Sequence, residues 1–320
     1  MSSKLTPLAP TSAAQPDSSR PYFGIGLGLV AVSTASLLIR YAQSEGVPSL
    51  VIAAYRLSLA SLVLAPFAVW RQASELRGFT RRQWALVLTS GIFLGAHFAA
   101  WISSLAYTSV ASSVVLVSSS PLFVALIAAL ALREKLSRVV MAGLVLTLAG
   151  AAVVGLSDVC APAACTSLYT FVQGSAFLGD VLAVLGALAL AIYLVAGRAL
   201  RAKVSLTSYI FTTYATAALV LVLVVSAARL PVAGYPARSY LWLSLLALVP
   251  QLVGHSSFNW ALKYLPATFV SVTILGEPAG SIVLAALLLR EVPGFVELGG
   301  SLLILAGILL ASRQPRAESN

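Results

Sequence analysis

The chain has 320 residues, of which 59% are hydrophobic and only 9% are charged, and its mean hydropathy is +0.96. These are too few polar groups to cover a water-soluble globule of this size, so we expect an integral membrane protein whose main partner is the lipid bilayer. The formal net charge is +10, but the basic residues lie in short loops between apolar runs, which favours a role in membrane orientation and excludes nucleic-acid binding.

The amino-terminal segment differs in composition from the rest of the chain. Residues 1–21 are rich in Ser, Pro and Ala and contain no apolar run, so we expect a disordered cytoplasmic tail. The small residues Ser12-Ala13-Ala14 precede the first apolar run, whereas in a cleaved signal peptide they would follow it. The run at 23–41 is therefore predicted to be a retained first membrane span.

Nine further apolar runs follow, each close to the ~20 residues that cross a ~30 Å hydrocarbon core. They are continuously apolar and too long for the alternating segments of a membrane β-barrel. The predicted fold is an all-α membrane protein with ten transmembrane helices. The later spans are expected at about 50–70, 83–107, 110–132, 137–157, 174–199, 206–228, 240–264, 267–289 and 294–312.

The second half of the chain repeats the first when the sequence is shifted by 157 positions, without a gap. Each copy contains five predicted helices, an odd number, so the second copy enters the membrane from the opposite face. The copies are therefore predicted to be inverted repeats around a central cavity, at 22–157 and 174–312, with an external connector at 158–173 and a cytoplasmic tail at 313–320. The aligned pairs include Leu105 with Leu262, Tyr107 with Tyr264, Val115 with Val272, Pro121 with Pro278, Arg133 with Arg290, Glu134 with Glu291, Gly143 with Gly300 and Gly150 with Gly307.

Basic residues are distributed unevenly across the predicted membrane. Fifteen of the 20 Lys and Arg residues fall on one side and four on the other, with Arg56 just inside the second span. Because cytoplasmic loops carry the excess of positive charge, both termini are predicted to be cytoplasmic, in a protein of the inner (plasma) membrane. The four basic residues on the outer side are Arg40, Arg229, Arg238 and Arg290.

Cys160 and Cys165 lie in the connector, which this orientation places outside. An oxidising compartment permits a small disulfide loop between them, and two free thiols in a flexible connector are the other interpretation. We assign neither cysteine a role in transport. The sequence indicates no metal site and no cofactor.

The third and eighth spans carry polar side chains at helical spacing. In the third span, His97, Trp101 and Ser104 share one face. The two spans are counterparts in the duplication, so their histidine-bearing faces are expected to meet across the pseudo-twofold axis. Hydrogen bonding that merely packs neighbouring helices is the alternative explanation. In the eighth span the residues are Gln251, His255, Asn259 and Lys263, four apart, with Trp260 beside Asn259.

The ninth span contains Gly276-Glu277-Pro278. Pro278 removes a backbone hydrogen bond in mid-span, so free carbonyl groups and the Glu277 carboxylate are expected at membrane depth. The equivalent residue in the first copy is Ser120, so only one copy carries the carboxylate. Glu277 is a candidate for proton coupling or for pairing with a charge, and bonding to backbone amides at a helix break is the alternative.

Arg56 lies near the outer end of the second span. We expect its side chain to reach outward to the interface, which is the commoner behaviour of an arginine there. The alternative is an ion pair with Glu277 or with a substrate carboxylate. Asp180, at the outer start of the sixth span, is expected to stabilise the N-terminus of its own helix.

These features together resemble the EamA-type permeases of the drug/metabolite transporter superfamily. The resemblance covers residues 22–312 and rests on the two inverted five-helix halves, on Glu277-Pro278, and on the Leu-Arg-Glu ends that both copies share at 132–134 and 289–291. It implies a basket-shaped bundle in which the first four helices of each half line the cavity and the fifth and tenth brace it from outside. It also implies export of amino acids or similar metabolites, aromatic amino acids among them.

One segment departs from the pattern of many relatives. Ser33-Thr34-Ala35-Ser36 stands in the first span, where those relatives carry a Trp. The substrate pocket of a relative therefore cannot be transferred to this chain residue by residue.

The predicted function is export or facilitated movement of small amphipathic metabolites, chiefly amino acids including aromatic ones, by alternating access between the two repeats. Aromatic rings would stack on the apolar part of the small-molecule substrate, and polar groups would bind its other end. One chain can build the whole cavity, so a monomer is sufficient and a dimer is not required. The candidate substrate-binding residues are His97, Trp101, Ser104, Tyr193, His255, Asn259, Trp260 and Ser36, and Glu277 and Arg56 are the candidate coupling or charge partners.

Three alternatives follow from the same residues. Proton-coupled efflux of cationic drugs would centre on Glu277, and whether transport is coupled to protons at all depends on Glu277, His97 and His255. An intramembrane enzyme would need a nucleophile with a base, or a second carboxylate at depth, and none accompanies Glu277, so we expect no enzyme activity. A sensor would need an output domain, which the short tails do not supply.

Overall fold

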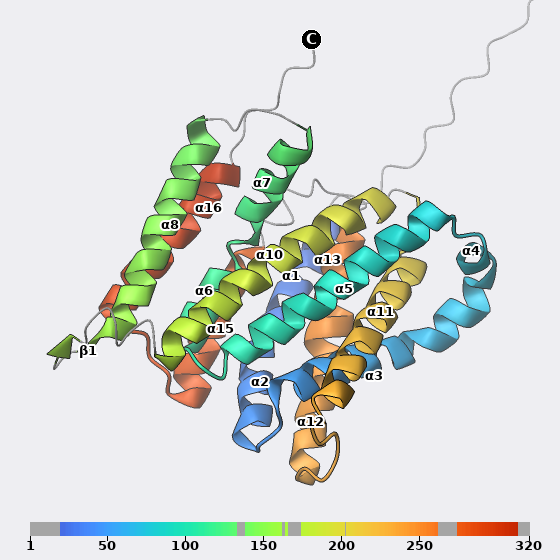
Figure 1. The fold of residues 1–320 in the computed structure, drawn as a ribbon, viewed down its shortest axis with the longest axis horizontal. Coiled ribbons are helices and arrows are strands. Elements are labelled where there is room, and N and C mark those ends of the chain that lie inside the picture. The colour runs from blue at the N-terminus through green and yellow to red at the C-terminus, as the bar shows by residue number, and fades with distance from the viewer. Residues whose placement is uncertain are drawn as a thin grey trace, which may run out of the picture.

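The structure, a computed structural model, describes residues 20–132, 138–161, 164–165, 174–201, 203–261 and 274–312, which are almost entirely helical (Figure 1). The first half contains α1 (Arg20–Ser33), α2 (Ala35–Ser44), α3 (Ser49–Arg71), α4 (Ala73–Arg77), α5 (Arg81–Ser104), α6 (Val110–Val117), α7 (Ser120–Leu132) and α8 (Arg138–Val159). The second half contains α10 (Ser175–Arg201), α11 (Leu206–Ala227), α12 (Ala237–Leu246), the π-helix η1 (Ala247–His255), α13 (Ser256–Ala261), α15 (Gly276–Leu284), the π-helix η2 (Ala285–Leu289) and α16 (Phe295–Ser312).

Within the described residues, seven helical segments are long and apolar enough to cross a membrane, so the protein is an integral multi-pass membrane protein. Three shorter apolar helices coincide with the predicted fifth, ninth and tenth spans, at Met141–Val154, Gly276–Leu289 and Phe295–Leu310. Ten full spans therefore stay a prediction. Residues 1–19 of the predicted tail at 1–21, the predicted tail at 313–320, and Arg133, Glu134 and Lys263 lie outside the described residues, whereas residues 20–21, predicted as tail, belong to α1. The seven segments are Tyr22–Ser44, Ser49–Arg71, Arg81–Ser104, Val110–Ile127, Ser175–Arg201, Leu206–Ala227 and Ala237–Ala261.

Equivalent helices in the two halves begin at equivalent residues. Helix α3 begins at Ser49 and α11 at Leu206, and α8 begins at Arg138 and α16 at Phe295, so both pairs are separated by the 157 positions of the sequence repeat. The duplication seen in the sequence is thus also a duplication of local structure.

A turn stands at equivalent positions in the two halves. The chain forms a turn at Ser118 between α6 and α7, and again at Leu275 before α15, and these positions are also 157 residues apart. Each turn precedes a proline by three residues, Pro121 and Pro278, which places that proline in the first turn of the following helix, where its missing N–H has no helical partner to lose. Pro278 was predicted to remove a backbone hydrogen bond in mid-span; it lies instead in the first turn of α15, where there is no such bond to lose, and the turn precedes it at Leu275.

The packing of the helices follows a twofold pattern. Helix α3 packs on its counterpart α11, and α8 packs on its counterpart α16; the latter pair runs side by side at the left of Figure 1. Contacts between non-equivalent helices also occur in matched pairs, since α5 packs against α10 while α1 packs against η1 and α13. Exchanging the two halves leaves this set of neighbours unchanged, as expected for two repeats related by a twofold axis.

The crossing of α8 and α16 shows the relative direction of the two copies. A Cβ atom added at Gly150 would lie 2.7 Å from the carbonyl oxygen of Gly300 and 2.7 Å from the amide nitrogen of Ile304. One added at Gly307 would lie 2.6 Å from the carbonyl oxygen of Gly143. The later residue of α8, Gly150, therefore contacts the earlier part of α16, and the earlier residue, Gly143, contacts the later part. The two helices are antiparallel. Antiparallel counterparts are what an inverted repeat requires.

Carboxylates at the ends of the bundle bind the N-termini of other helices, where exposed N–H groups and the helix dipole favour negative charge. The pKa of Glu45 is lowered by the Ser239 hydroxyl and by Arg238 and Trp242, all on α12. Three such contacts tie α12, α11 and α6 to other elements: Glu45 with Arg238, Ser239 and Trp242; Glu75 with Ser205 and Ser208; and Glu297 with Ser109 and Ser112.

The predicted role of Asp180 is wrong in its details. Asp180 is the sixth residue of α10, beyond the first turn whose free N–H groups it was expected to stabilise. Its carboxylate accepts a hydrogen bond from the Thr108 hydroxyl at 3.0 Å, and the residue is 8% exposed. Asp180 therefore ties α10 to the loop that follows α5.

Replacing Glu75 should destabilise the protein more at neutral pH than at acid pH. Burial raises the pKa of Glu75, but hydrogen bonds from Ser205 and Ser208 outweigh it, so the pKa lies below its usual value. This stabilisation is present above the carboxyl's ordinary pKa and is lost as the pH falls through the lowered one. We expect Glu75→Gln to cost about 1 kcal/mol at pH 7 and almost nothing near pH 3. Thermal unfolding of the purified protein at both pH values measures this, and an equal loss at both would contradict it.

The connector contains a small hairpin. Strands β1 (Cys160–Ala161) and β2 (Ala164–Cys165) pair antiparallel, with Cys160 opposite Cys165 in the backbone register. The cysteine side chains lie outside the described part of the structure, so the disulfide stays a prediction.

Candidate functional site

Arg56 is fully buried near the middle of the bundle, so the expectation that it reaches outward is wrong. It lies seven residues into α3, about 10 Å below the helix start at Ser49. Val51, Ile52 and Leu57 around it are also fully buried, because α5, α11 and η1 enclose this part of α3. The side chain therefore has no path to the interface and turns inward.

The Arg56 guanidinium contacts one amide and two aromatic rings. Its Nε donates a hydrogen bond to Oε1 of Gln251 in η1, at 2.7 Å. Its central carbon lies 4.0 Å from the centroid of the Phe98 ring and 5.8 Å from that of Trp101, both on α5. Such stacking of a cation on aromatic faces is favourable, especially away from water. The two terminal nitrogens, Nη1 and Nη2, are buried and make no hydrogen bond to the described residues.

Both histidines contact the aromatic rings beside Arg56. His97 is 4% exposed, its Nδ1 lies 2.9 Å from the carbonyl oxygen of Gly186 in α10, and its ring stacks on Trp101 with centroids 5.9 Å apart. His255 meets the Phe98 ring edge to face at 5.5 Å. The third and eighth helices therefore do bring their imidazoles to one place, where both contact the phenyl ring of Phe98. We call Arg56, Phe98, Trp101, His97, His255 and Gln251 the central cluster.

A proline explains the local shape of the eighth helix. Pro250 lies inside η1, where it has no N–H to donate to the preceding turn and its ring would clash with that turn's carbonyl. The widened π-helical turns accommodate it, and such wide turns are frequent at functional sites. In the first copy the equivalent position is Phe93, and α5 continues there as a regular α-helix. Gln251 and His255 thus present their side chains from wide turns that the first copy lacks.

A second polar layer lies beside the central cluster. The hydroxyl of Tyr193 in α10 and the amide of Asn259 in α13 bond each other, at 3.2 and 3.3 Å. The hydroxyl of Tyr209 in α11 lies 3.1 Å from that of Ser90 in α5. All four residues are at most 4% exposed. Tyr193 and Asn259 were predicted; Ser90 was missed although it lies seven residues before His97, on the same helical face.

Three predicted site residues lie elsewhere. Ser104 bonds the carbonyl of Trp101 and the hydroxyl of Ser113, so it joins α5 to α6. Trp260 lies over Gly24 of α1 and belongs to a separate apolar group with Ile25, Val32 and Phe258. Ser36 is buried on α2 and makes no hydrogen bond to the central cluster.

Glu277 lies in the first turn of α15. It makes no hydrogen bond or ion pair with the described residues, although its charge and that of Arg56 interact electrostatically. The neighbouring turn of the same helix rests on the interruption between α1 and α2, because the Ser281 hydroxyl donates to the carbonyl of Ser33 at 3.2 Å. Glu277 is thus a carboxylate near, but not paired with, the buried guanidinium.

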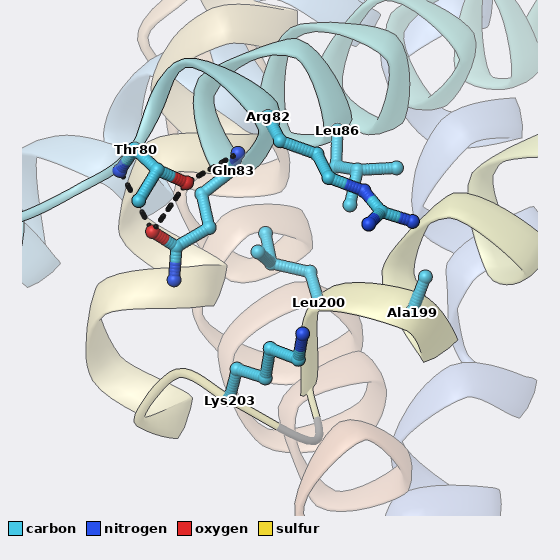
Figure 2. Close-up of a pocket in the computed structure, with 7 residues that line it drawn as sticks. All are labelled: Thr80, Arg82, Gln83, Leu86, Ala199, Leu200 and Lys203. Carbon is cyan, nitrogen blue, oxygen red and sulfur yellow. Dashed lines mark hydrogen bonds between the residues drawn. The ribbon is translucent and has the colours of Figure 1, made fainter.

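Two surface pockets lie away from the central cluster. One, of about 180 Å³, opens at the basic end of the bundle between the start of α5 and the end of α10. Figure 2 shows that Arg82 and Lys203 extend into it and that Thr80 and Gln83 form a capping box beside it. The other, of about 100 Å³, is almost wholly apolar and is lined by residues of α6, α7, α8, α10 and α16. Neither contains a predicted site residue.

Nothing in the described residues is arranged as a metal site, since no three His, Cys, Asp or Glu side chains lie together there. The central cluster contains a permanent cation, two imidazoles, an amide and two aromatic rings, but no nucleophile bonded to a base. Its chemistry is that of binding: it offers hydrogen-bond donors and ring faces inside an apolar bundle.

Comparison with known proteins agrees with this architecture. A solved structure described only as "Crystal structure of protein" is similar over 92% of this chain and 96% of its own, with a TM-score of 0.61 and 21% identity, which supports the fold alone. No curated protein matches the chain. The model of the EamA-like transporter family matches twice, at 20–156 and 177–313. Because these matches cover most of the chain and correspond to its two structural repeats, the chain belongs to the EamA-like transporter family, whose members are membrane transporters of the drug/metabolite superfamily.

Proposed function

We propose that this transporter moves small amphipathic metabolites, chiefly amino acids including aromatic ones, across the plasma membrane. The observation that carries the proposal is the central cluster. Polar groups at membrane depth are costly unless they face a partner or a pathway, and here they gather with aromatic rings where the two halves meet. Rings suit the apolar part of an amino acid, and hydrogen-bond donors suit its polar end.

Alternating access between the two repeats is the mechanism we propose. The central cluster draws residues from both copies, with Arg56 and Trp101 from the first and Gln251 and His255 from the second. Rocking one half against the other would therefore separate its members and expose the site to one side at a time. All members come from one chain, so we propose that a monomer is sufficient. The excess of basic residues on one side supports cytoplasmic termini.

Efflux of cationic drugs is the second candidate function. Glu277 favours it, because this carboxylate lies within a predicted span, interacts electrostatically with Arg56 and has no ion-pair partner among the described residues. A carboxylate of this kind attracts cations and exchanges protons. The two proposals differ in the charge of the substrate group that binds, which makes them separable by experiment.

Counterflow in liposomes should distinguish these functions. The purified protein is reconstituted, the vesicles are loaded with single amino acids or small organic cations, and exchange of the radiolabelled compound is followed with and without a pH gradient. We expect saturable exchange of aromatic and large apolar amino acids, and none in vesicles without protein. Exchange of cations alone would instead support drug efflux, and exchange that is indifferent to the gradient would indicate a facilitator.

A further inference from the structure

The Arg56 guanidinium has donors that the protein does not use. Its Nε is bonded to Gln251, which fixes the plane of the group, while Nη1 and Nη2 remain buried without a hydrogen bond to the described residues. A buried donor without an acceptor is costly, and more so when it is charged. The residue is 0% exposed, so bulk water cannot satisfy these donors.

The acidic side chains that the structure describes do not supply the missing acceptor. Five of them are already bonded to other groups: Glu45 to α12, Glu75 to α11, Glu291 to Arg40, Glu297 to Ser109 and Ser112, and Asp180 to Thr108. Within the spans Glu277 is close enough to interact electrostatically but forms no ion pair with Arg56. An arginine buried without its counter-ion is strongly unfavourable unless another anion binds there.

The surroundings of these donors indicate the shape of that anion. A guanidinium held in one plane presents parallel N–H groups, which match the two oxygens of a carboxylate. The ring of Phe98, 4.0 Å from the guanidinium carbon, and that of Trp101, 5.8 Å away, make the surroundings of the guanidinium apolar and aromatic. A ligand there would join a carboxylate directly to an apolar body.

We infer that Arg56 is the substrate-binding residue of this transporter for carboxylates, and that the substrates are monocarboxylates with an apolar or aromatic body. This inference rests on the proposed function and restricts the proposed substrates to carboxylates. The site recognises the carboxylate of the substrate, whereas an ammonium group on the same substrate is tolerated but not required. Gln251 acts as a positioning residue, since it orients the guanidinium without contacting the substrate.

Competition by analogues tests the inference on the unmodified protein. Counterflow of radiolabelled phenylalanine is measured with 3-phenylpropionate, which lacks the ammonium group, and with 2-phenylethylamine, which lacks the carboxylate. We expect 3-phenylpropionate to compete within about tenfold of phenylalanine itself, and 2-phenylethylamine to compete at least about 100-fold more weakly, as for loss of a charge-assisted bidentate pair. Equal or better competition by the amine would overturn the inference.

Variants of Arg56 give a second measurement. Arg56→Gln removes the charge, and Arg56→Lys keeps the charge but removes the planar pair of N–H donors. We expect the affinity for 3-phenylpropionate to fall about 100-fold in the first variant and about tenfold in the second. The loss is measured as a smaller stabilisation of the protein by 3-phenylpropionate against thermal unfolding. Arg71→Gln, at the exposed inner end of the same helix, is the matched control and should bind normally. Binding within about threefold of the unmodified protein in both Arg56 variants would overturn the inference.

These experiments separate the inference from the proposed function. If no amino acid exchanges but 3-phenylpropionate still stabilises the unmodified protein and not Arg56→Lys, the carboxylate site stands and the proposed function fails. If amino acids exchange while the Arg56 variants bind normally, the proposed function stands and the inference fails. If the variants do not fold, competition between the two analogues on the unmodified protein decides.

Discussion

Gly150→Ile should prevent α8 and α16 from packing and should lower the thermal stability of the protein more than any single change at its surface. The new Cβ atom would lie 2.7 Å from the carbonyl oxygen of Gly300 and from the amide of Ile304. Both are backbone atoms, so no side chain can rotate away and the helices must separate. Overpacking costs about 1–3 kcal/mol where side chains can adjust, and we expect more than about 3 kcal/mol here.

The bundle provides a matched control and a test of its symmetry. Gly299→Ile places the same side chain on α16, at an exposed position with no atom within 4 Å, and should leave stability nearly unchanged. Gly307→Ile, the twofold counterpart of the first variant, should be as damaging, because its Cβ would meet the carbonyl oxygen of Gly143 at 2.6 Å. Thermal unfolding of the three purified variants in detergent is the measurement. Similar unfolding temperatures for Gly150→Ile and Gly299→Ile would contradict this description of the crossing.

Much of the architecture could be predicted because the second half of the sequence repeats the pattern of the first. A shift of 157 positions aligns the repeated pairs, and the structure begins α3 and α11, and α8 and α16, at that same separation. Apolar length identified the spans, and an odd number of helices in each copy implied that the second copy is inverted. These inferences depend only on composition and periodicity, which a membrane constrains strongly.

Which way individual side chains point could not be predicted in the same way. The position of Arg56 near the end of its predicted span suggested that its side chain reaches outward. The neighbouring residues of α3 are buried too, because α5, α11 and η1 pack around this part of the helix. The sequence of α3 does not show this packing. Helical spacing placed Trp260 with the central residues, whereas it lies against Gly24 of α1. The phase of the eighth helix changes at the wide turns around Pro250, and a regular 3.6-residue period does not describe residues beyond them.

The hydrogen bond from the Arg56 Nε to Gln251 could not be predicted from the sequence either. Gln251 stood out in the sequence as one step of a polar ladder, and Arg56 as an isolated cation 195 residues away. Nothing in either segment marks the other as its partner. Their hydrogen bond joins the two copies of the repeat, and it became visible only once η1 was placed beside α3.

Glu277→Gln should abolish the response of transport to a pH gradient while leaving exchange intact. Glu277 forms no hydrogen bond with the described residues, whereas Asp180, a carboxyl group within α10, accepts one from Thr108, so we expect Glu277 to be the group that gains and loses a proton as the halves move. The charged group that interacts electrostatically with Glu277 is Arg56, and the imidazoles of His97 and His255 interact with Arg56 in turn. If Glu277 carries the proton, replacing it by an amide of the same shape leaves the carboxylate-binding groups in place.

Substrate accumulation under a pH gradient and counterflow without one are both measured on Glu277→Gln. With a gradient of one pH unit, worth about 1.4 kcal/mol per proton, the unmodified protein should accumulate substrate up to about tenfold, and Glu277→Gln should not accumulate it at all. Counterflow without a gradient should stay within about twofold. His97→Gln and His255→Gln are the comparison variants, and retention of the gradient response in Glu277→Gln but not in them would move the coupling to the imidazoles. Loss of cation exchange alone in Glu277→Gln would instead favour the drug-efflux function, because a carboxylate needed only for cations is a binding group and not a proton carrier.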